Sequence, residues 1–216
     1  LINNPWGESN EKGFRHALEQ RDMEWAGIER IEGSDLDVIP QLTRLKNAGA
    51  DTLLMVGNVG PSAQVVKSLD RMGWDVPVVS HWGPAGGRFS ELAGPNADRV
   101  HFIQTYVFTE NNSAKGDEVL SALKARYPEI QSLADITPAV GIANAYDAMH
   151  LSALAIEKAG STDGTAVRDG FYAIDSYAGL IKDYSTPFTP EQHDALGPQD
   201  YVFTHFVDGS IVPVKP

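Results

Sequence analysis

The sequence contains no cysteine, few basic residues and no long apolar run. Without cysteine, a disulfide framework, a zinc–thiolate site and a cysteine nucleophile are all excluded. Lys and Arg number 17 against 29 Asp and Glu, a formal net charge of −12. The chain therefore lacks the basic surface that nucleic acids and anionic membranes require. No stretch approaches the roughly 18 apolar residues of a membrane span, so we expect no nucleic-acid partner and no direct membrane insertion.

The signatures of several enzyme classes are missing as well. The sequence holds no G-x-x-x-x-G-K-[ST], G-x-G-x-x-G, G-x-S-x-G or H-E-x-x-H motif. His193 and Asp194 are adjacent on an irregular segment, where neighbouring side chains usually point apart into solvent. Asp147 and His150 share one face of a predicted helix, but two ligands are too few for a metal site, and a hydrogen bond on the helix surface is favoured. We predict no catalytic residue, no metal and no cofactor.

Hydrophobic patterning indicates alternating strands and helices. The 216 residues are 42% hydrophobic, an ordinary globular value, and suffice for one large domain or two lobes. Apolar residues recur at helical spacing in six segments, and continuous or alternating apolar runs indicate strands. Asp208-Gly209 between two apolar runs indicates a hairpin. The expected helices cover 9–22, 38–48, 61–72, 113–127, 138–158 and 165–174, and the expected strands 24–31, 52–56, 76–80, 99–107, 179–184, 201–207 and 211–214.

Strand–helix pairs with short loops predict a parallel sheet with right-handed crossovers. We therefore expect an α/β fold, with a doubly wound parallel lobe over residues 1–104 and helices on both faces of its sheet. The opening Leu1-Ile2-Asn3-Asn4 resembles the end of a strand, and the sequence has neither an initiating Met nor a visible signal peptide. We expect a chain that lacks its front part. The apolar face of helix 138–158 should then be partly exposed.

Three loops follow the carboxyl ends of strands in the predicted lobe. Ligands of open α/β sheets bind at that edge. The loops carry Trp6, Asn58 and Trp82, with glycines that allow a ligand close to the backbone. The two tryptophans either form the wall of a ligand site or merely cover the edge of the sheet.

The order of these motifs resembles the type I periplasmic solute-binding proteins, and most closely the branched-chain amino-acid (leucine-isoleucine-valine) binding proteins of ABC importers. The resemblance covers essentially the whole chain. Its main elements are the Asn-x-x-Trp-Gly loop, a helix ending in Leu-Lys-Asn-Ala-Gly-Ala-Asp, the Ala-Tyr-Asp-Ala helix at 145–148, and the closing segment 179–196.

The resemblance implies two α/β lobes of the type I periplasmic-binding-protein fold, with the first lobe incomplete in this chain. Residues 1–104 would form the second lobe, 105–176 a helical part of the first lobe, and 177–216 a segment returning to the second. It implies a periplasmic protein, or an extracytoplasmic lipid-anchored one in a Gram-positive host. Its partners would be a small-molecule solute and the membrane permease of an ABC transporter, and it would not be an enzyme.

The same resemblance suggests which residues meet the solute. Trp6, Asn58 and Trp82 match cleft positions of the family, and Tyr106 near the crossover is a further candidate. Amino-acid binders often place a carboxylate beside the third loop, whereas this chain has His81-Trp82-Gly83, which favours an apolar or aromatic solute or a cation on an indole face. A small amino-acid-like solute stays open. Two other classes also stay open: a ligand-binding sensor of the same fold, and a hydrolase or transferase.

Overall fold

The computed structural model describes residues 1–214, which divide into two compact units. Unit 1 comprises Leu1–Ile103 and the chain from Phe203 onward, and unit 2 comprises Gln104–Val202. The expected assignment of 1–104, 105–176 and 177–216 to lobes of the family fold stays a prediction. Within unit 2, a buried carboxylate on the longest helix binds Leu180, Ile181 and Tyr184.

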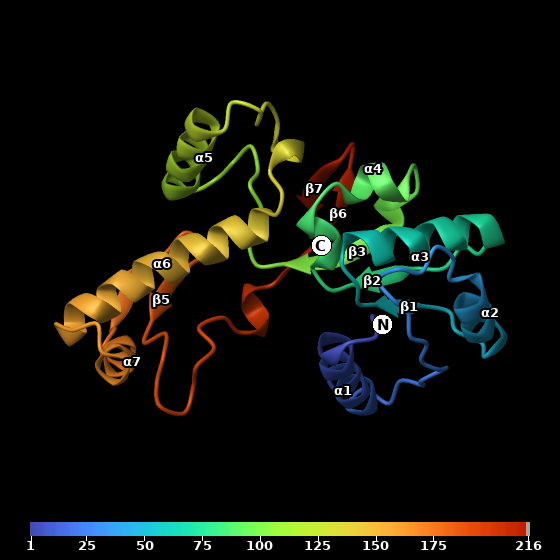
Figure 1. Ribbon diagram of the computed structural model, residues 1–216, viewed down its shortest axis with the longest axis horizontal. Helices are drawn as coiled ribbons and strands as arrows, with labels where there is room; N and C mark the ends of the chain where they lie inside the picture. Colours follow the sequence, from blue (N-terminus) through green and yellow to red (C-terminus); the bar gives the residue numbers. More distant parts are fainter. Residues whose placement is uncertain (215–216) are drawn as a thin grey trace. The chain divides into compact units, whose positions relative to one another are not determined.

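Unit 1 is built on a five-stranded sheet with the order β1-β2-β3-β6-β7 (Figure 1). Strands β1, β2 and β3 pair in parallel, which confirms the predicted parallel sheet. β6 and β7 form the predicted hairpin, and Asp208 and Gly209 at its turn have φ of 49° and 80°, as a type I′ turn requires. The elements are α1 (Pro5–Glu19), α2 (Ile39–Asn47), β1 (Leu53–Met55), α3 (Val59–Met72), β2 (Val78–Ser80), α4 (Phe89–Ala93), β3 (Val100–Gln104), β6 (Val202–Val207) and β7 (Ser210–Pro213).

One face of this sheet is buried along its parallel strands. Alternate residues of the parallel strands, such as Leu53, Val78 and Phe102, pack against apolar side chains of α2, α3 and α4. Phe206 of β6 joins them and stacks on Phe89 of α4, with ring centroids 5.3 Å apart. The opposite face is only half-buried, and there His101 stacks on His205 with centroids 5.5 Å apart. This alternation is the period-2 pattern of a sheet with one well-covered face.

Two local predictions for unit 1 are wrong. Residues 24–31 form no strand, and only Ile31 pairs, as an isolated parallel bridge with Ile2. Helix α1 begins at Pro5 rather than Ser9, because the Asn4 side chain accepts a hydrogen bond from Gly7 N–H and Pro5 suits the first turn. The first predicted loop is therefore mostly helix.

Unit 2 contains three α-helices, two short 3-10 helices (Leu133–Asp135 and Pro198–Asp200) and a small antiparallel hairpin. The helices are α5 (Ala114–Arg126), α6 (Ala139–Ala159) and α7 (Gly164–Tyr172), and the hairpin strands are β4 (Ser176–Ala178) and β5 (Asp183–Ser185). The single strand predicted for 179–184 is wrong, because Gly179 N–H donates to Lys182 C=O and turns the chain there.

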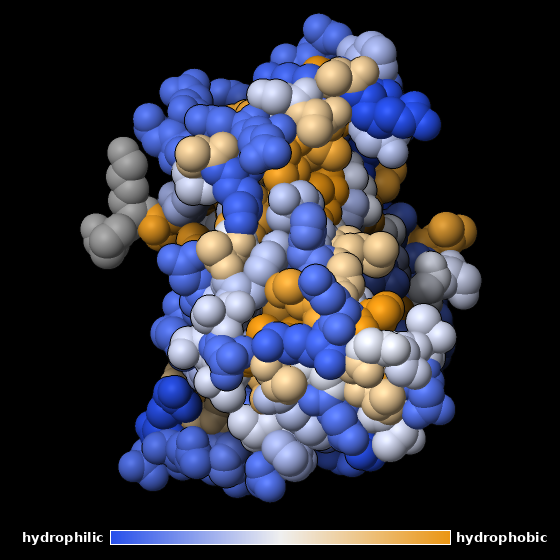
Figure 2. Space-filling view, turned by 90° about the vertical axis from the view of Figure 1, so that its left-hand side faces the viewer, coloured by the Kyte–Doolittle hydropathy of each residue, from blue (hydrophilic) through white to orange (hydrophobic). Residues whose placement is uncertain are grey.

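Helix α6 is the longest helix of unit 2, and its apolar side chains are unevenly buried. Val140, Ala143 and Leu151 are buried, whereas Met149 is 71% exposed and Ile156 40%. The expected exposure of its apolar face thus holds for part of the helix. Figure 2 shows apolar surface among hydrophilic residues on the side of the molecule that faces its viewer. Over residues 1–214, no helix is both long and apolar enough to cross a membrane.

Candidate functional site

The ends of three elements of unit 1 meet at one place. A Cβ atom added to Gly83, after β2, would lie 1.9 Å from the carbonyl oxygen of Gly57, after β1. Only glycine permits such a close approach of two backbones. The same position lies 3.4 Å from the ring of Trp6 on α1. The structure therefore brings together the three predicted loops within unit 1.

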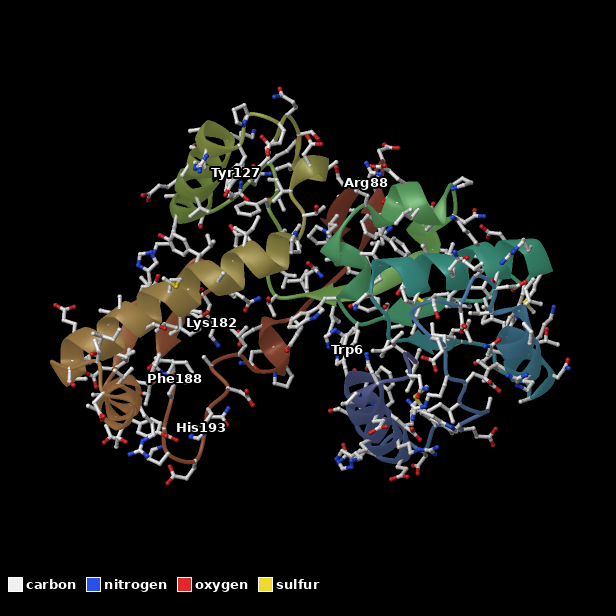
Figure 3. All side chains as sticks on the ribbon, viewed as in Figure 1. Trp6, Arg88, Tyr127, Lys182, Phe188 and His193 are labelled. Carbon is white, nitrogen blue, oxygen red and sulfur yellow. The ribbon has the colours of Figure 1, made fainter. Side chains whose placement is uncertain are left out.

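Trp6 is fixed by the start of α1. The Asn4 cap accepts from Gly7 N–H at 3.0 Å, and Asn10 donates its side-chain amide to the Trp6 carbonyl at 2.9 Å. Gly7 must stay glycine, since a Cβ there would lie 1.9 Å from the Ile2 carbonyl oxygen. Figure 3 shows Trp6 at the start of this helix, half-buried. The indole is thus presented from a rigid helix rather than a loop.

His81 joins the two indoles, a role that sequence reasoning missed. Its ring meets the Trp6 ring edge-to-face at a centroid distance of 5.3 Å and the Trp82 ring at 4.8 Å. Edge-to-face contacts of this kind are the favoured geometry of aromatic pairs. The only available signal was its place beside Trp82 after a buried strand. The three rings form a continuous row, which we call the aromatic wall: Trp6, His81 and Trp82.

The electrostatics of the aromatic wall favour a neutral imidazole. Burial lowers the pKa of His81 below its ordinary value. The backbone N–H of Trp82 donates to Nδ1 of His81 at 2.9 Å, so Nδ1 is the acceptor and the ring proton sits on Nε2. The wall therefore offers apolar ring surface and the N–H donors of its three rings, without a formal charge of its own.

Asn58 lies at the start of α3 and directly follows Gly57, whose carbonyl oxygen lies against Gly83. It is exposed, and its carbonyl oxygen accepts from Ser62 N–H at 3.0 Å. Within the described part of the chain, its side chain makes no capping hydrogen bond to the helix. Its amide donor and acceptor are thus available to orient a bound molecule.

Tyr106 belongs to unit 2 and packs within that unit. Its ring meets Phe108 edge-to-face with centroids 5.0 Å apart, and its hydroxyl crowds Gly116 on α5. Burial raises the pKa of Tyr106, and the carboxylates of Asp117 and Asp147 raise it further. Trp6 and Trp82 are thus joined through His81, and Asn58 follows the Gly57 backbone that lies against Gly83, whereas Tyr106 sits in the apolar cluster under α5.

Asp147 corrects another prediction. It is 2% exposed, not a helix-surface residue, and it accepts hydrogen bonds from Leu180 N–H at 2.6 Å, Ile181 N–H at 2.9 Å and the Tyr184 hydroxyl at 2.9 Å. Burial, and then the bond to Asp147, raise the pKa of Tyr184. A carboxylate with three donors is a structural clamp that ties α6 to the segment after β4.

His193 and Asp194 lie at an exposed loop, as expected. The His193 ring stacks on Tyr172, and its Nε2 lies 3.1 Å from the Tyr172 hydroxyl. Both residues border a cavity of about 570 Å³ inside unit 2. Among residues 1–214, no three His, Asp or Glu side chains come close enough together to hold a metal ion.

Comparison with known proteins yields one family. The family model described as "Periplasmic binding protein" matches residues 2–209. A curated relative, the Leu/Ile/Val-binding protein homolog 3 of Brucella melitensis, is 26% identical over 161 residues. That alignment covers 74% of this chain and 41% of the relative.

Solved structures agree on the fold. A periplasmic binding protein type 1 from Bordetella pertussis superposes with a TM-score of 0.85 at 20% identity, over 99% of this chain and 59% of that one. The branched-chain amino acid binding protein LivJ of Streptococcus pneumoniae, in complex with isoleucine, gives 0.71 at 23%, over 99% and 57%. A solute binding protein of Rhodopseudomonas palustris in complex with benzoate gives 0.74 at 16%, over 99% and 56%. The chain thus spans about half the length of these relatives.

Proposed function

The chain belongs to the periplasmic binding protein family, and from that premise we propose that it is part of the solute-binding component of an ABC importer. The family is extracytoplasmic. We further propose a periplasmic location, or a lipid-anchored one outside a Gram-positive cell. Its partners are a small-molecule solute and a membrane permease. Its role is to bind the solute, not to convert it.

The contact of Trp6 and Trp82 through His81, with Asn58 one residue after the Gly57 backbone that meets Gly83, supports this proposal. Aromatic surface with one or two orienting polar groups is the usual composition of a small-molecule site. We propose that the solute lies flat against the aromatic wall while Asn58 orients its polar end. Tyr106 is proposed as a contact from unit 2 on the family resemblance alone.

The chemistry of the wall favours an aromatic or apolar solute. The segment 81–83 has no carboxylate to meet an ammonium group, and the ring faces suit stacking. The solved structures from Streptococcus pneumoniae and Rhodopseudomonas palustris hold isoleucine and benzoate, so both classes of ligand occur on this fold. Benzoate presents a ring to the indoles and a carboxylate to the donors of Asn58 and His81, and it is the better match.

Titration of the full chain with benzoate, isoleucine and choline tests the proposal. Binding is followed by tryptophan fluorescence and calorimetry. An aromatic contact adds about 0.5–1.5 kcal/mol beyond buried area, so Trp82→Ala should weaken benzoate binding about tenfold. Trp25→Ala is the matched control, since Trp25 lies outside the three loops and contacts Arg15.

Equal benzoate affinity for Trp82→Ala and the parent would contradict the role of the aromatic wall. Tight isoleucine binding without benzoate binding would contradict the aromatic solute class but leave solute binding intact. No binding of any of the three probes, or of a wider panel of small acids and amines, would count against the proposed function itself.

A further inference from the structure

His81 ties the aromatic wall to the backbone of the loop after β2. The backbone N–H of Trp82 donates to Nδ1 of the imidazole at 2.9 Å. Nδ1 accepts this hydrogen bond only while it carries a lone pair, which it has in the neutral ring and loses in the imidazolium. The bond therefore exists in one protonation state of His81 and not in the other.

The backbone on both sides of this hydrogen bond is held in place. The Trp82 carbonyl oxygen accepts from Ala85 N–H at 2.9 Å, at the start of the 3-10 helix Gly83–Gly86. His81 N–H donates to Met55 C=O at 3.3 Å, and the loop also lies against the end of β1. A proton on Nδ1 would set two donors face to face. Because the backbone is fixed, the imidazole is the group that must turn away.

The imidazole is also the ring that joins the two indoles. Its centroid lies 5.3 Å from that of Trp6 and 4.8 Å from that of Trp82, edge-to-face in both cases. Edge-to-face contacts depend on ring orientation, so a turn of the imidazole breaks both of them. Protonation of His81 therefore divides the wall into two separate indoles.

The charged groups of the elements around His81 do not offset this effect. The first two turns of α1 carry Glu8 and Glu11, the loop after β2 carries Arg88, and Leu53–Met55 of β1 carry no charge. Glu11 is engaged by two arginines, and Arg88 pairs with a glutamate three residues later. Burial, and none of these charges, is what lowers the pKa of His81. A ring bound on the wall would bury the imidazole further and favour its neutral form still more.

We propose that His81 makes solute binding at the aromatic wall proton-dependent: the neutral imidazole joins the indoles into one binding surface, and the imidazolium breaks that surface and releases the solute. The opening of the wall concerns unit 1 alone, whereas the release of a solute rests on the proposed function. Because coupling between two binding events is reciprocal, a solute that favours the neutral ring is held less tightly once the ring is protonated. An anion such as benzoate also attracts the imidazolium, so release is most complete for an uncharged ring.

The first experiment titrates the free chain by NMR between about pH 8 and about pH 4.5, across the ordinary range of histidine. In the closed wall, ring currents of the two indoles shift the His81 ring protons. These shifts should disappear, and the Trp82 amide proton should move upfield, with the same midpoint as the protonation of His81. Circular dichroism establishes that the chain stays folded. His101→Gln is the matched control, since His101 is a half-buried, ring-stacked histidine of the same unit that lies outside the wall.

The second experiment measures the Kd of benzamide by calorimetry over the same pH range. Benzamide has a ring and carries no charge at any of these pH values. Its Kd should rise about tenfold for each pH unit below the midpoint found for His81, and the Kd of benzoate should rise less. The rise should be absent in His81→Gln and unchanged in His101→Gln. At neutral pH, His81→Lys, which carries a permanent cation, should bind benzamide at least about fivefold more weakly than His81→Gln.

Two results would overturn the proposal. One is a His81 ring that keeps its ring-current shifts after protonation, and the other is a benzamide Kd that does not change through the titration of His81. Equal benzamide affinity of His81→Lys and His81→Gln would count against it at a pH where the chain is folded. Failure of benzamide and benzoate to bind at any pH would count against the proposed function instead, while the ring-current shifts still decide whether a proton opens the wall.

Discussion

Asn in place of Asp147 should destabilise unit 2 strongly. The carboxylate receives three donors: Leu180 N–H on one oxygen, and Ile181 N–H and the Tyr184 hydroxyl on the other. Asparagine has one carbonyl oxygen, and its amide nitrogen is a donor. Whichever way the side chain turns, at least one buried donor faces another donor.

The size of the expected loss in stability follows from the burial of Asp147. Hydrogen bonds to a charged group are worth about 1.5–3 kcal/mol, and a buried donor left without an acceptor costs about 1–3 kcal/mol. Asp147 is 2% exposed, so water cannot substitute. We expect a loss of about 2–4 kcal/mol in the free energy of unfolding of unit 2, or about 10 °C or more in its unfolding midpoint.

Native-state hydrogen exchange is the appropriate assay, because two units need not unfold in one transition. The amides of Leu180 and Ile181 report the clamp directly. Asp169→Asn serves as the control, since Asp169 is exposed and pairs with Arg168 on the surface, and it should change stability by less than about 0.5 kcal/mol. The same exchange rates for Asp147→Asn and the parent would refute the clamp.

Three further outcomes are expected. Gly83→Ala should destabilise unit 1 by about 1–3 kcal/mol and alter tryptophan fluorescence, because its Cβ would meet the Gly57 carbonyl oxygen; an unchanged melting curve would show that the loops separate freely. Since the pKa of His81 is lowered on folding, the unfolded state takes up the proton first. Urea midpoints of unit 1 should therefore fall as the pH drops below about 6.5, and less so in His81→Gln. Burial raises the pKa of Tyr177 to about 12. Because the unfolded state then loses the phenolic proton first, the free energy of unfolding of unit 2 should fall as the pH rises above about 10. The absorbance of the Tyr177 phenolate should appear only well above about pH 10 in the folded protein, and its appearance near that pH would contradict this prediction.

The sequence predicts most helices and turns that are determined by residues close together in the chain. The spacing of Val65, Val66 and Leu69 predicts α3, which ends at Gly73 with φ 57° as a helix-terminating glycine should. Asp208-Gly209 predicts the β6–β7 turn. In each case the determining residues lie within a few positions of one another.

Features that depend on distant partners could not be predicted in this way. The sequence pattern pairs Asp147 with its neighbour His150, whereas its hydrogen-bond partners lie 33 to 37 residues away. Residues 24–31 have the composition of a strand, but a strand needs a partner along its whole edge, and only Ile31 has one. The place of His81 between two indoles depends on how α1 packs beside the end of β2.

The composition of the aromatic wall also limits which interactions can select a solute. In the proposed site, the ring faces of Trp6 and Trp82 would distinguish ring-bearing from aliphatic solutes but not one ring from another. Directional selection would fall to the hydrogen-bonding groups: the Asn58 amide, the indole N–H groups, and Nε2–H of His81, whose tautomer is set by the Trp82 backbone. A hydrogen-bonding site rejects an analogue that leaves its groups unpaired far more strongly than an apolar surface rejects a change of shape. Specificity within the proposed aromatic class should therefore reside in these hydrogen-bonding groups, while the ring faces set the affinity common to the class.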